Sequence, residues 1–220
     1  MPAAMMRVLL ECVVETAAAA EEAERAGADR LELCVRLDLG GITPPDDVID
    51  AVLSRVAIPV FVMVRERGGD FVYTDAEYTR MLRDAARIRE RGAHGLVFGA
   101  LRPDRRIDVA RTCELVAAAG NLPVTFHRAF DEVEDQSAAL EDVVAAGARR
   151  VLTSGGAASA IQGAGRLADL VRQAGTRLTI LAGGGVRAAN AVDVIARTGV
   201  HEVHARHETE AATRALAGLL

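Results

Sequence analysis

Short segments rich in β-branched and aliphatic residues recur along this chain at near-regular intervals, and a helix-like stretch follows each of them. There are eight such segments, and they span residues 7–13, 30–35, 60–65, 95–99, 124–128, 150–154, 178–182 and 202–205. No linker or change of composition interrupts the series. Eight consecutive β/α units are typical of a closed parallel barrel, so we expect an α/β fold of the (β/α)8 TIM-barrel type. An open, doubly wound sheet of similar length is the competing fold.

Helix boundaries fit the same pattern. Gly27, Gly92 and Gly147 each precede an expected strand, where glycine accepts the left-handed turn that ends a helix. The segment 43–46 places a threonine before prolines, and the segment 74–77 has the form of a capping box. The chain of 220 residues is long enough for one well-buried core, and we expect a single domain over residues 1–220.

Composition excludes several classes of function. The chain contains no lysine, so all 26 basic residues are arginines. Schiff-base aldolase chemistry, pyridoxal-phosphate anchoring and the P-loop all need an amine, and the sequence excludes them. The formal net charge of -5 and the interleaving of arginines with acids argue against a nucleic-acid partner.

The apolar segments are too short for a membrane span, since the run 58–64 is strand-sized and a span needs about 20 residues. Residues 1–7 lack the pattern of a signal peptide, and we expect a cytoplasmic protein. Cys12, Cys34 and Cys113 are odd in number and widely spaced, which predicts free thiols rather than disulfides or a structural zinc site. Cys113 falls in a predicted helix over 108–119, and we expect it to be a packed core thiol.

Ionisable residues stand near the carboxyl ends of several expected strands, where barrels place their reactive groups. They are Glu11, Glu32, Arg65 and His127. We expect these four to converge in one polar pocket, with Arg65 and His127 as partners of the glutamates, because an acid on a buried strand needs a partner. A purely structural salt-bridge cluster closing the barrel is the alternative.

Side chains alternate along a strand, so Glu32 shares a face with Cys34, whereas Glu11 points away from Cys12. If the glutamates face the barrel axis, Cys34 faces it too and Cys12 faces the helices. His204 lies on the last expected strand, next to the first one in a closed barrel, and is close enough in position to approach Glu11. The other histidines, apart from His127, lie at strand beginnings or beyond the last strand.

Two glycine runs and one charged loop point to an anion. Gly155-Gly156 and Gly183-Gly184-Gly185 follow neighbouring expected strands, just before helices, where bare amides favour a phosphate or carboxylate. Tight β/α turns also need glycine, so this alternative stays open. Any further positive group must be an arginine, and Arg187 and Arg206 are nearest. The loop 65–73, with its arginines and paired glycines, fits a flexible lid or anion clamp and also an ordinary charged loop.

The chain resembles the CutC family in a specific set of segments that runs from the first strand to the last. The matching segments are 28–34, 40–44, 67–73, 124–131 and 151–155. The matching positions are Glu11, Glu32, Cys34, Arg65, Arg67, Asp70, His127, Arg128, Asp131 and His204. The resemblance implies a cytoplasmic barrel, commonly a homodimer, that is assigned to copper homeostasis and for which copper binding has been proposed.

Two departures from the family pattern bear on the site. The family often has a cysteine two residues after the first-strand glutamate, where this chain has Val13, and this weakens a paired-thiolate copper site. After the histidine of the last strand the family often has small residues, whereas this chain has Ala205 and Arg206. Arg206 either lines an anion pocket or fills it.

Three classes of function follow. A copper-handling protein would use Cys34 and His127 as metal ligands, with or without Cys12. A barrel enzyme of lyase, isomerase or hydrolase type would act on a small phosphorylated or carboxylated molecule and use the glycine runs to hold its anion. Its catalytic or substrate-orienting residues would be Glu11, Glu32, Arg65, His127, Asp131 and His204. A pure interaction scaffold is disfavoured, because it gives no reason for polar groups at so many strand ends.

Overall fold

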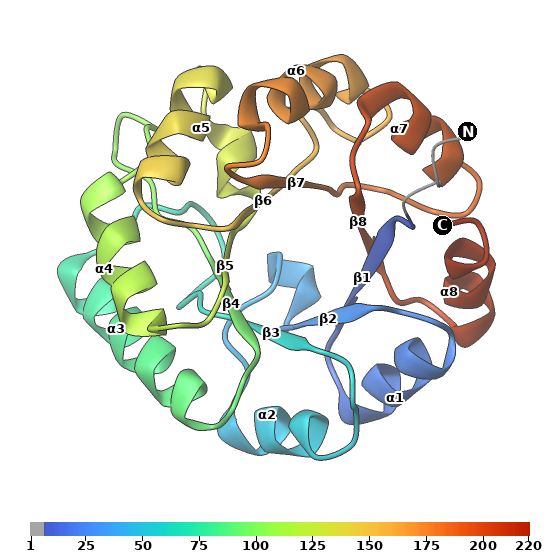
Figure 1. Cartoon of the computed structure of the whole chain (residues 1–220). Coiled ribbons are helices and arrows are strands. Elements are labelled where there is room, and N and C mark those ends of the chain that lie inside the picture. Colours follow the sequence, from blue (N-terminus) through green and yellow to red (C-terminus); the bar gives the residue numbers. More distant parts are fainter. Residues whose placement is uncertain (1–6) are drawn as a thin grey trace.

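The computed structural model describes residues 7–220 as a closed barrel of eight parallel strands in the order β1 to β8, surrounded by helices (Figure 1). The strands are β1 (Leu9–Val14), β2 (Arg30–Leu33), β3 (Val60–Met63), β4 (Gly95–Phe98), β5 (Val124–Phe126), β6 (Arg150–Thr153), β7 (Thr179–Ala182) and β8 (Glu202–Arg206). Pairing of β1 with β8 closes the sheet, which confirms the predicted TIM barrel and excludes the open sheet. The signal-peptide prediction concerns residues 1–6, which lie outside the described residues, and Arg7.

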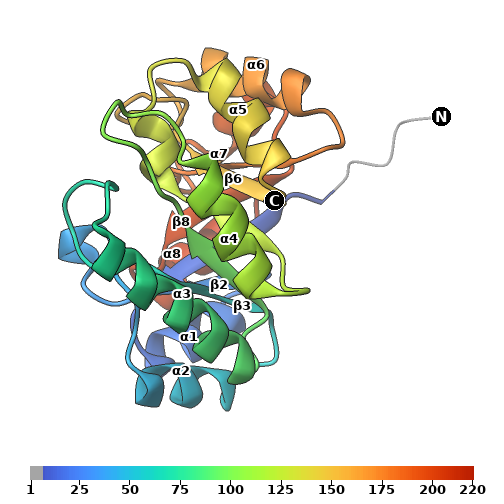
Figure 2. The same cartoon turned by 90° about the vertical axis from the view of Figure 1, so that its left-hand side faces the viewer.

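One helix follows each strand. They are α1 (Ala17–Arg25), α2 (Asp46–Leu53), α3 (Asp75–Glu90), α4 (Val109–Ala119), α5 (Gln136–Ala145), α6 (Ala164–Ala174), α7 (Ala191–Thr198) and α8 (Glu210–Ala217). Two short 3-10 helices, η1 (Leu37–Leu39) and η2 (Arg128–Glu132), follow β2 and β5. In the view of Figure 2, the loop after β3 projects on the left-hand side of the barrel. That side is the barrel mouth. Within residues 7–220, no helix is both long enough and apolar enough to cross a membrane.

Alternation along the strands divides the core into two parts. Outward-facing residues such as Leu10, Cys12 and Val14 pack with the helices in one large apolar cluster. A small second cluster lies in the barrel interior and consists of Val13, Cys34, Phe61, Met63 and Val97. The rest of the interior contains charged side chains, which are described below.

Most of the predicted helix boundaries are confirmed. Thr74 and Glu77 form a capping box at the start of α3, and Gly27, Gly92 and Gly147 have φ values of 100°, 90° and 88°. The cap predicted at Thr43 is wrong, because Pro45 precedes α2 without a side-chain cap. The Thr43 hydroxyl instead bonds to both backbone groups of Arg65.

The prediction that Cys113 is a core thiol is also wrong. Cys113 does lie in α4, but its side chain is exposed. The buried face of α4 is formed by Thr112, Leu115 and Ala119 instead. The predicted helix was right, and the direction in which it faces was not.

The packing at Gly95 offers a test of the barrel interior. A Cβ added at Gly95 would lie 2.6 Å from three ring atoms of Phe61, which is 3% exposed. We expect Gly95→Ala to lower the free energy of unfolding by about 1–3 kcal/mol, because an overpacked core must shift the ring. Urea denaturation measures this change.

The matched control is Gly165→Ala, since Gly165 lies in α6 and an added Cβ would meet nothing within 4 Å. Replacing a helical glycine by alanine without a clash is expected to stabilise the protein by about 0.5 kcal/mol or more. Equal effects of the two substitutions would contradict the close contact between Gly95 and Phe61.

Candidate functional site

A cavity of about 410 Å³ opens at the barrel mouth. It is covered in part by the segment around η1, and its walls combine apolar residues with ionisable ones. The ionisable residues are Glu32, Arg65, His127, Arg128, Asp131, Glu132 and His204. Five of the six residues for which the sequence predicted a catalytic role therefore line one cavity, from β2, the loop after β3, the loop after β5 and β8.

The sixth residue, Glu11, lies beneath this cavity. It is the third residue of the six-residue strand β1, so it is not at the strand end as the sequence suggested. Its side chain is 0% exposed. In the register of the sheet Glu11 stands level with Arg30 on one side and with His204 on the other.

Those two neighbours are the partners of Glu11. One carboxylate oxygen accepts a hydrogen bond from Arg30 Nε at 2.5 Å, and the other lies 2.8 Å from His204 Nδ1. The expectation that Arg65 or His127 would pair with Glu11 is therefore wrong. Arg30 also bonds to Glu202 at 2.5 Å, and Glu202 contacts Arg150 at 2.7 Å.

Sequence reasoning missed Arg30, Arg150 and Glu202. They stand at the first positions of β2, β6 and β8, and each lies two residues before an inward-facing residue of the mouth. The signal was present, since Arg30 and Glu202 alternate in phase with Glu32 and His204. The expectation that barrels place reactive groups at strand ends does not extend to residues at strand starts.

The pKa values of Glu11, His204 and Glu32 are shifted in different directions. Burial alone would raise the pKa of Glu11, but the Arg30 charge and the bond to His204 outweigh it and lower the pKa to about 2. Burial would lower the pKa of His204, but Glu32 and Glu11 outweigh it and raise that pKa. Glu11 is therefore a permanent anion at neutral pH, and it favours an imidazolium at His204.

Glu32 has the opposite character. Burial raises its pKa to about 7, and the Glu11 charge adds to the increase while His204 opposes it. Its side chain is 3% exposed, and its Oε2 atom has no hydrogen-bond partner among residues 7–220. A buried carboxyl without a partner, in a cavity and near neutrality in pKa, is suited to exchange a proton with a bound molecule.

His127 presents a donor to the same cavity. Burial, with the nearby Arg65 charge, lowers its pKa to about 3, so the ring is neutral. Its Nδ1 accepts a hydrogen bond from the Ala129 amide at 3.2 Å. The proton of the neutral ring must therefore be on Nε2, which has no partner within the described residues.

Arg65 is fixed by backbone oxygens. Its guanidinium donates to the carbonyls of Leu39, Gly41 and Gly69 at 2.8–3.1 Å and lies 4.6 Å from the centre of the Phe71 ring. Arg67 is likewise held by Glu77 and by carbonyls of its own loop. These arginines therefore hold the loop 65–73 together. Because most of their donors already bond to the protein, few are left to bind an external anion.

Asp131 fills the first of the two glycine loops. Its carboxylate accepts hydrogen bonds from the amides of Ser154 and Gly156 at 3.0–3.2 Å and from the Thr153 hydroxyl at 2.5 Å. Arg128 completes this set of donors at 2.8 Å. The loop at Gly155-Gly156 does hold an anion, but that anion belongs to the protein.

The glycine runs do not open helices, contrary to the prediction. Helix α6 begins at Ala164 and helix α7 at Ala191, several residues after each run. In the second run, Gly183 donates to the carbonyl of Thr153, as in a sheet. Gly184 and Gly185 have φ values of 99° and 71° and line a second cavity beside the mouth.

The two strand cysteines lie on opposite sides of the barrel wall, as the alternation predicted. Cys12 packs in the helical layer, and Cys34 packs inside the barrel with Val13 and Met63. Burial raises the pKa of Cys12 to about 12 and raises that of Cys34 as well. Both are thiols rather than thiolates, and they do not converge on one ion.

Comparison with known proteins places the chain in a family. The model of the CutC family matches residues 8–209. The chain belongs to the CutC family. A family protein CutC of Mesorhizobium japonicum is 50% identical over 196 residues, covering 89% of this chain and 76% of that protein. The human copper homeostasis protein cutC homolog is 46% identical, covering 89% and 72%.

Solved structures agree with this assignment. A CutC from Streptococcus agalactiae, with 35% identity, superposes with a TM-score of 0.85 over 90% of this chain and 97% of that one. A deoxyribose-phosphate aldolase from Coccidioides immitis matches with a TM-score of 0.71 at 14% identity, over 100% and 86% of the two chains. The aldolase shares the barrel alone, and this CutC chain has no lysine for aldolase chemistry.

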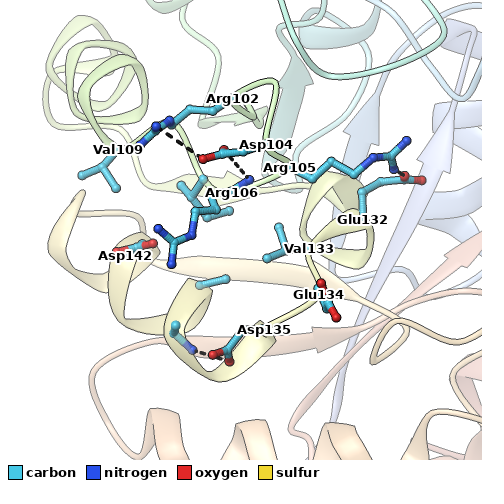
Figure 3. Close-up of a pocket in the computed structure, with 13 residues that line it drawn as sticks. Arg102, Asp104, Arg105, Arg106, Val109, Glu132, Val133, Glu134, Asp135 and Asp142 are labelled. Carbon is cyan, nitrogen blue, oxygen red and sulfur yellow. Dashed lines mark hydrogen bonds and ion pairs between the residues drawn. The ribbon is translucent and has the colours of Figure 1, made fainter.

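A larger cavity of about 670 Å³ lies outside the barrel, between the loop 101–107 and the segment that enters α5 (Figure 3). Four of its eight charged residues form ion pairs with one another: Arg102 pairs with Asp104, and Arg105 pairs with Glu132. Asp135 caps α5. None of the residues that the sequence predicted to be functional lines this cavity. The barrel mouth therefore remains the candidate site.

The pKa of Glu32 predicts a dependence of stability on pH. Below about pH 4.5 the carboxyl is protonated in both the folded and the unfolded chain, and above about pH 7 the folded protein carries the full cost of an ionised buried group. Stability from this group therefore falls as pH rises between these values. We expect Glu32→Gln to remove this cost. Its effect on the free energy of unfolding, relative to wild type, should be more stabilising at pH 8 than at pH 5 by about 1–3 kcal/mol.

Urea denaturation at the two pH values measures this difference. Glu90→Gln serves as the control, because Glu90 is exposed on α3 and should show no such dependence. An effect of Glu32→Gln that is equal at both pH values would show that Glu32 is not held near neutrality.

Proposed function

We propose that this CutC protein is a general acid–base enzyme that acts on a small anionic molecule at the barrel mouth. The observation that carries the proposal is the unpartnered, buried Glu32 carboxyl, which shares the mouth with His204. A purely structural salt-bridge cluster would leave Glu32 paired. Instead the structural pairs lie below, between Glu11, Arg30, Glu202 and Arg150.

Glu32, His204 and His127 each have a distinct role in this proposal. Glu32, with a pKa of about 7, takes or gives a proton near neutral pH. His204 is kept cationic by Glu11 and serves as a proton donor or as a positive partner for developing negative charge. The neutral His127 offers its Nε2 proton as a hydrogen bond to a substrate oxygen.

Arg65 and Glu11 act on the site from its edge. Arg65 is held by three carbonyls, so it fixes the wall between η1 and the loop 65–73 and contributes positive charge to it. Glu11 touches no substrate space and acts through His204. Because the chain has no lysine, the reaction proceeds without an imine on the enzyme. Lyase, isomerase and hydrolase types all agree with these roles.

The test is a turnover screen with a panel of small phosphorylated and carboxylated metabolites in D2O, read by NMR for conversion or deuterium uptake. We expect wild type to act on at least one compound and Glu32→Gln to lower its rate by about 10²-fold or more, since general acid–base groups contribute this much. His204→Asn is expected to act in the same direction.

Glu90→Gln is the control and should retain wild-type turnover. Circular dichroism checks that each variant is folded. Turnover that survives in Glu32→Gln, or a panel that yields no conversion by wild type, would contradict the acid–base proposal.

Copper handling is a second candidate, because the family includes copper homeostasis proteins and one group of side chains could hold a metal. Ligand atoms of Glu11, Glu32 and His204 all lie within 4.8 Å of one another. Carboxylates with one imidazole suit a divalent ion better than Cu(I), which prefers thiolates. The Cys12 and Cys34 pair does not fit as a chelate, because the two thiols are separated by the barrel wall.

Metal titration tests the placement of such a site. We expect Cys12→Ala to bind Cu(I) with wild-type affinity, because Cys12 faces the helices and shares no ligand with Cys34. If a divalent copper ion binds in the mouth, Glu32→Gln should weaken Cu(II) binding at least about tenfold. A large loss of Cu(I) affinity in Cys12→Ala would overturn the separation of the thiols. A cytoplasmic location and a homodimer stay predictions from the sequence.

A further inference from the structure

A second cavity of about 510 Å³ lies directly beside the mouth. Both cavities are lined by Val13, Leu37, Arg128 and His204. The second cavity continues from His204 toward the loop after β7 and the start of α8. A ligand that reached from one cavity into the other would pass His204.

The wall of this second cavity includes a row of open backbone donors. Gly184, Gly185 and Val186 line it, and none of their three consecutive amides donates to an acceptor within residues 7–220. Gly184 and Gly185 both have positive φ values. Successive amides in a turn of this kind form a concave anion-binding surface, and here no helix terminus is involved, because α7 begins only at Ala191.

The protein itself shows what such a loop binds. The neighbouring glycine loop after β6 also offers three consecutive amides, those of Ser154, Gly155 and Gly156. There the Asp131 carboxylate takes two of them, and the Thr153 hydroxyl takes the third. Within residues 7–220, no acid accepts a hydrogen bond from the amides of Gly184, Gly185 and Val186, so these amides are open to an anion from outside the protein.

Arg206 adds an unpaired positive charge to this cavity. It lines the same cavity at the end of β8, and its guanidinium has no ion pair or hydrogen bond with any of the described residues. The other two arginines of the cavity are paired, Arg187 with Glu208 and Arg128 with Asp131. Arg206 therefore lines this cavity with an unpaired positive charge, which favours an anion there.

We infer that the Gly184–Gly185–Val186 amides and Arg206 bind the phosphate of a phosphomonoester whose other end lies between Glu32 and His204. This inference rests on the proposed acid–base function and names its substrate class. A phosphate is favoured over a carboxylate because Arg128, Arg187 and Arg206 face only one acid, Glu208, in this cavity. A dianion with three oxygens can use both the row of amides and a bidentate arginine.

The experiment measures binding of inorganic phosphate by 31P NMR and calorimetry to wild type and to Arg206→Gln. We expect Arg206→Gln to weaken phosphate binding at least about tenfold, because it removes a charge-assisted contact. Arg55→Gln is the matched control, since Arg55 is exposed, lacks a partner among the described residues and lies between α2 and β3 at the opposite end of the barrel. Its phosphate affinity should equal that of wild type.

Acetate is expected to bind more weakly than phosphate, and crystals soaked in phosphate should show it at Gly184–Val186. Equal affinities of Arg206→Gln and Arg55→Gln, an absence of millimolar binding by wild type, or tighter binding of acetate would each overturn the inference. Glu32→Gln should keep the phosphate affinity of wild type. Phosphate binding without Glu32-dependent turnover would refute the enzyme proposal alone, and such turnover without phosphate binding would refute the phosphate site alone.

Discussion

The buried ion pair between Glu11 and Arg30 is the constraint on which both the barrel and its site depend. A carboxylate that is fully removed from water costs several kcal/mol unless charge and hydrogen bonds compensate it. Arg30 on β2 and His204 on β8 provide both. These are the two strands that flank β1, and β1 with β8 is the pair that closes the sheet. Closure of the barrel and placement of His204 are therefore achieved by the same contacts.

The two interior carboxylates, Glu11 and Glu32, differ in how far hydrogen-bond partners satisfy them. Arg30 contacts two carboxylates, and both oxygens of Glu11 have partners. Glu32, one layer higher, stands level with Val13 and has no cation bonded to it. An ionised Glu11 nearby makes a second negative charge costly, which favours the protonated form of Glu32. Glu11, in the lower layer, thus stays ionised, whereas Glu32 at the mouth can gain or lose a proton near neutral pH.

Sequence reasoning was sufficient for the parts that depend on local periodicity. The eight strands, their alternation and the opposite faces of Cys12 and Cys34 follow from spacing along the chain. The partner of Glu11 does not, because it depends on the register between strands, and spacing alone cannot set that register. The prediction that Cys113 is buried was wrong for a related reason. The helix could be predicted from the sequence, but its rotation against the barrel could not. Site roles for the mouth residues stay predictions that the proposed experiments test.

The two glycine loops also could not be distinguished from the sequence, and the difference between them bears on the proposed chemistry. In the sequence they look equivalent, and only the folded chain brings Asp131 from the loop after β5 onto one of them. The loop that stays open is the one beside His204, and so the donors left for an external anion adjoin the residues left with an exchangeable proton. The chain has no lysine, so no side-chain amine is available to form an imine with a carbonyl substrate. The proposed chemistry therefore relies on the unpartnered Glu32 carboxyl and on the open amides beside His204, and not on an imine.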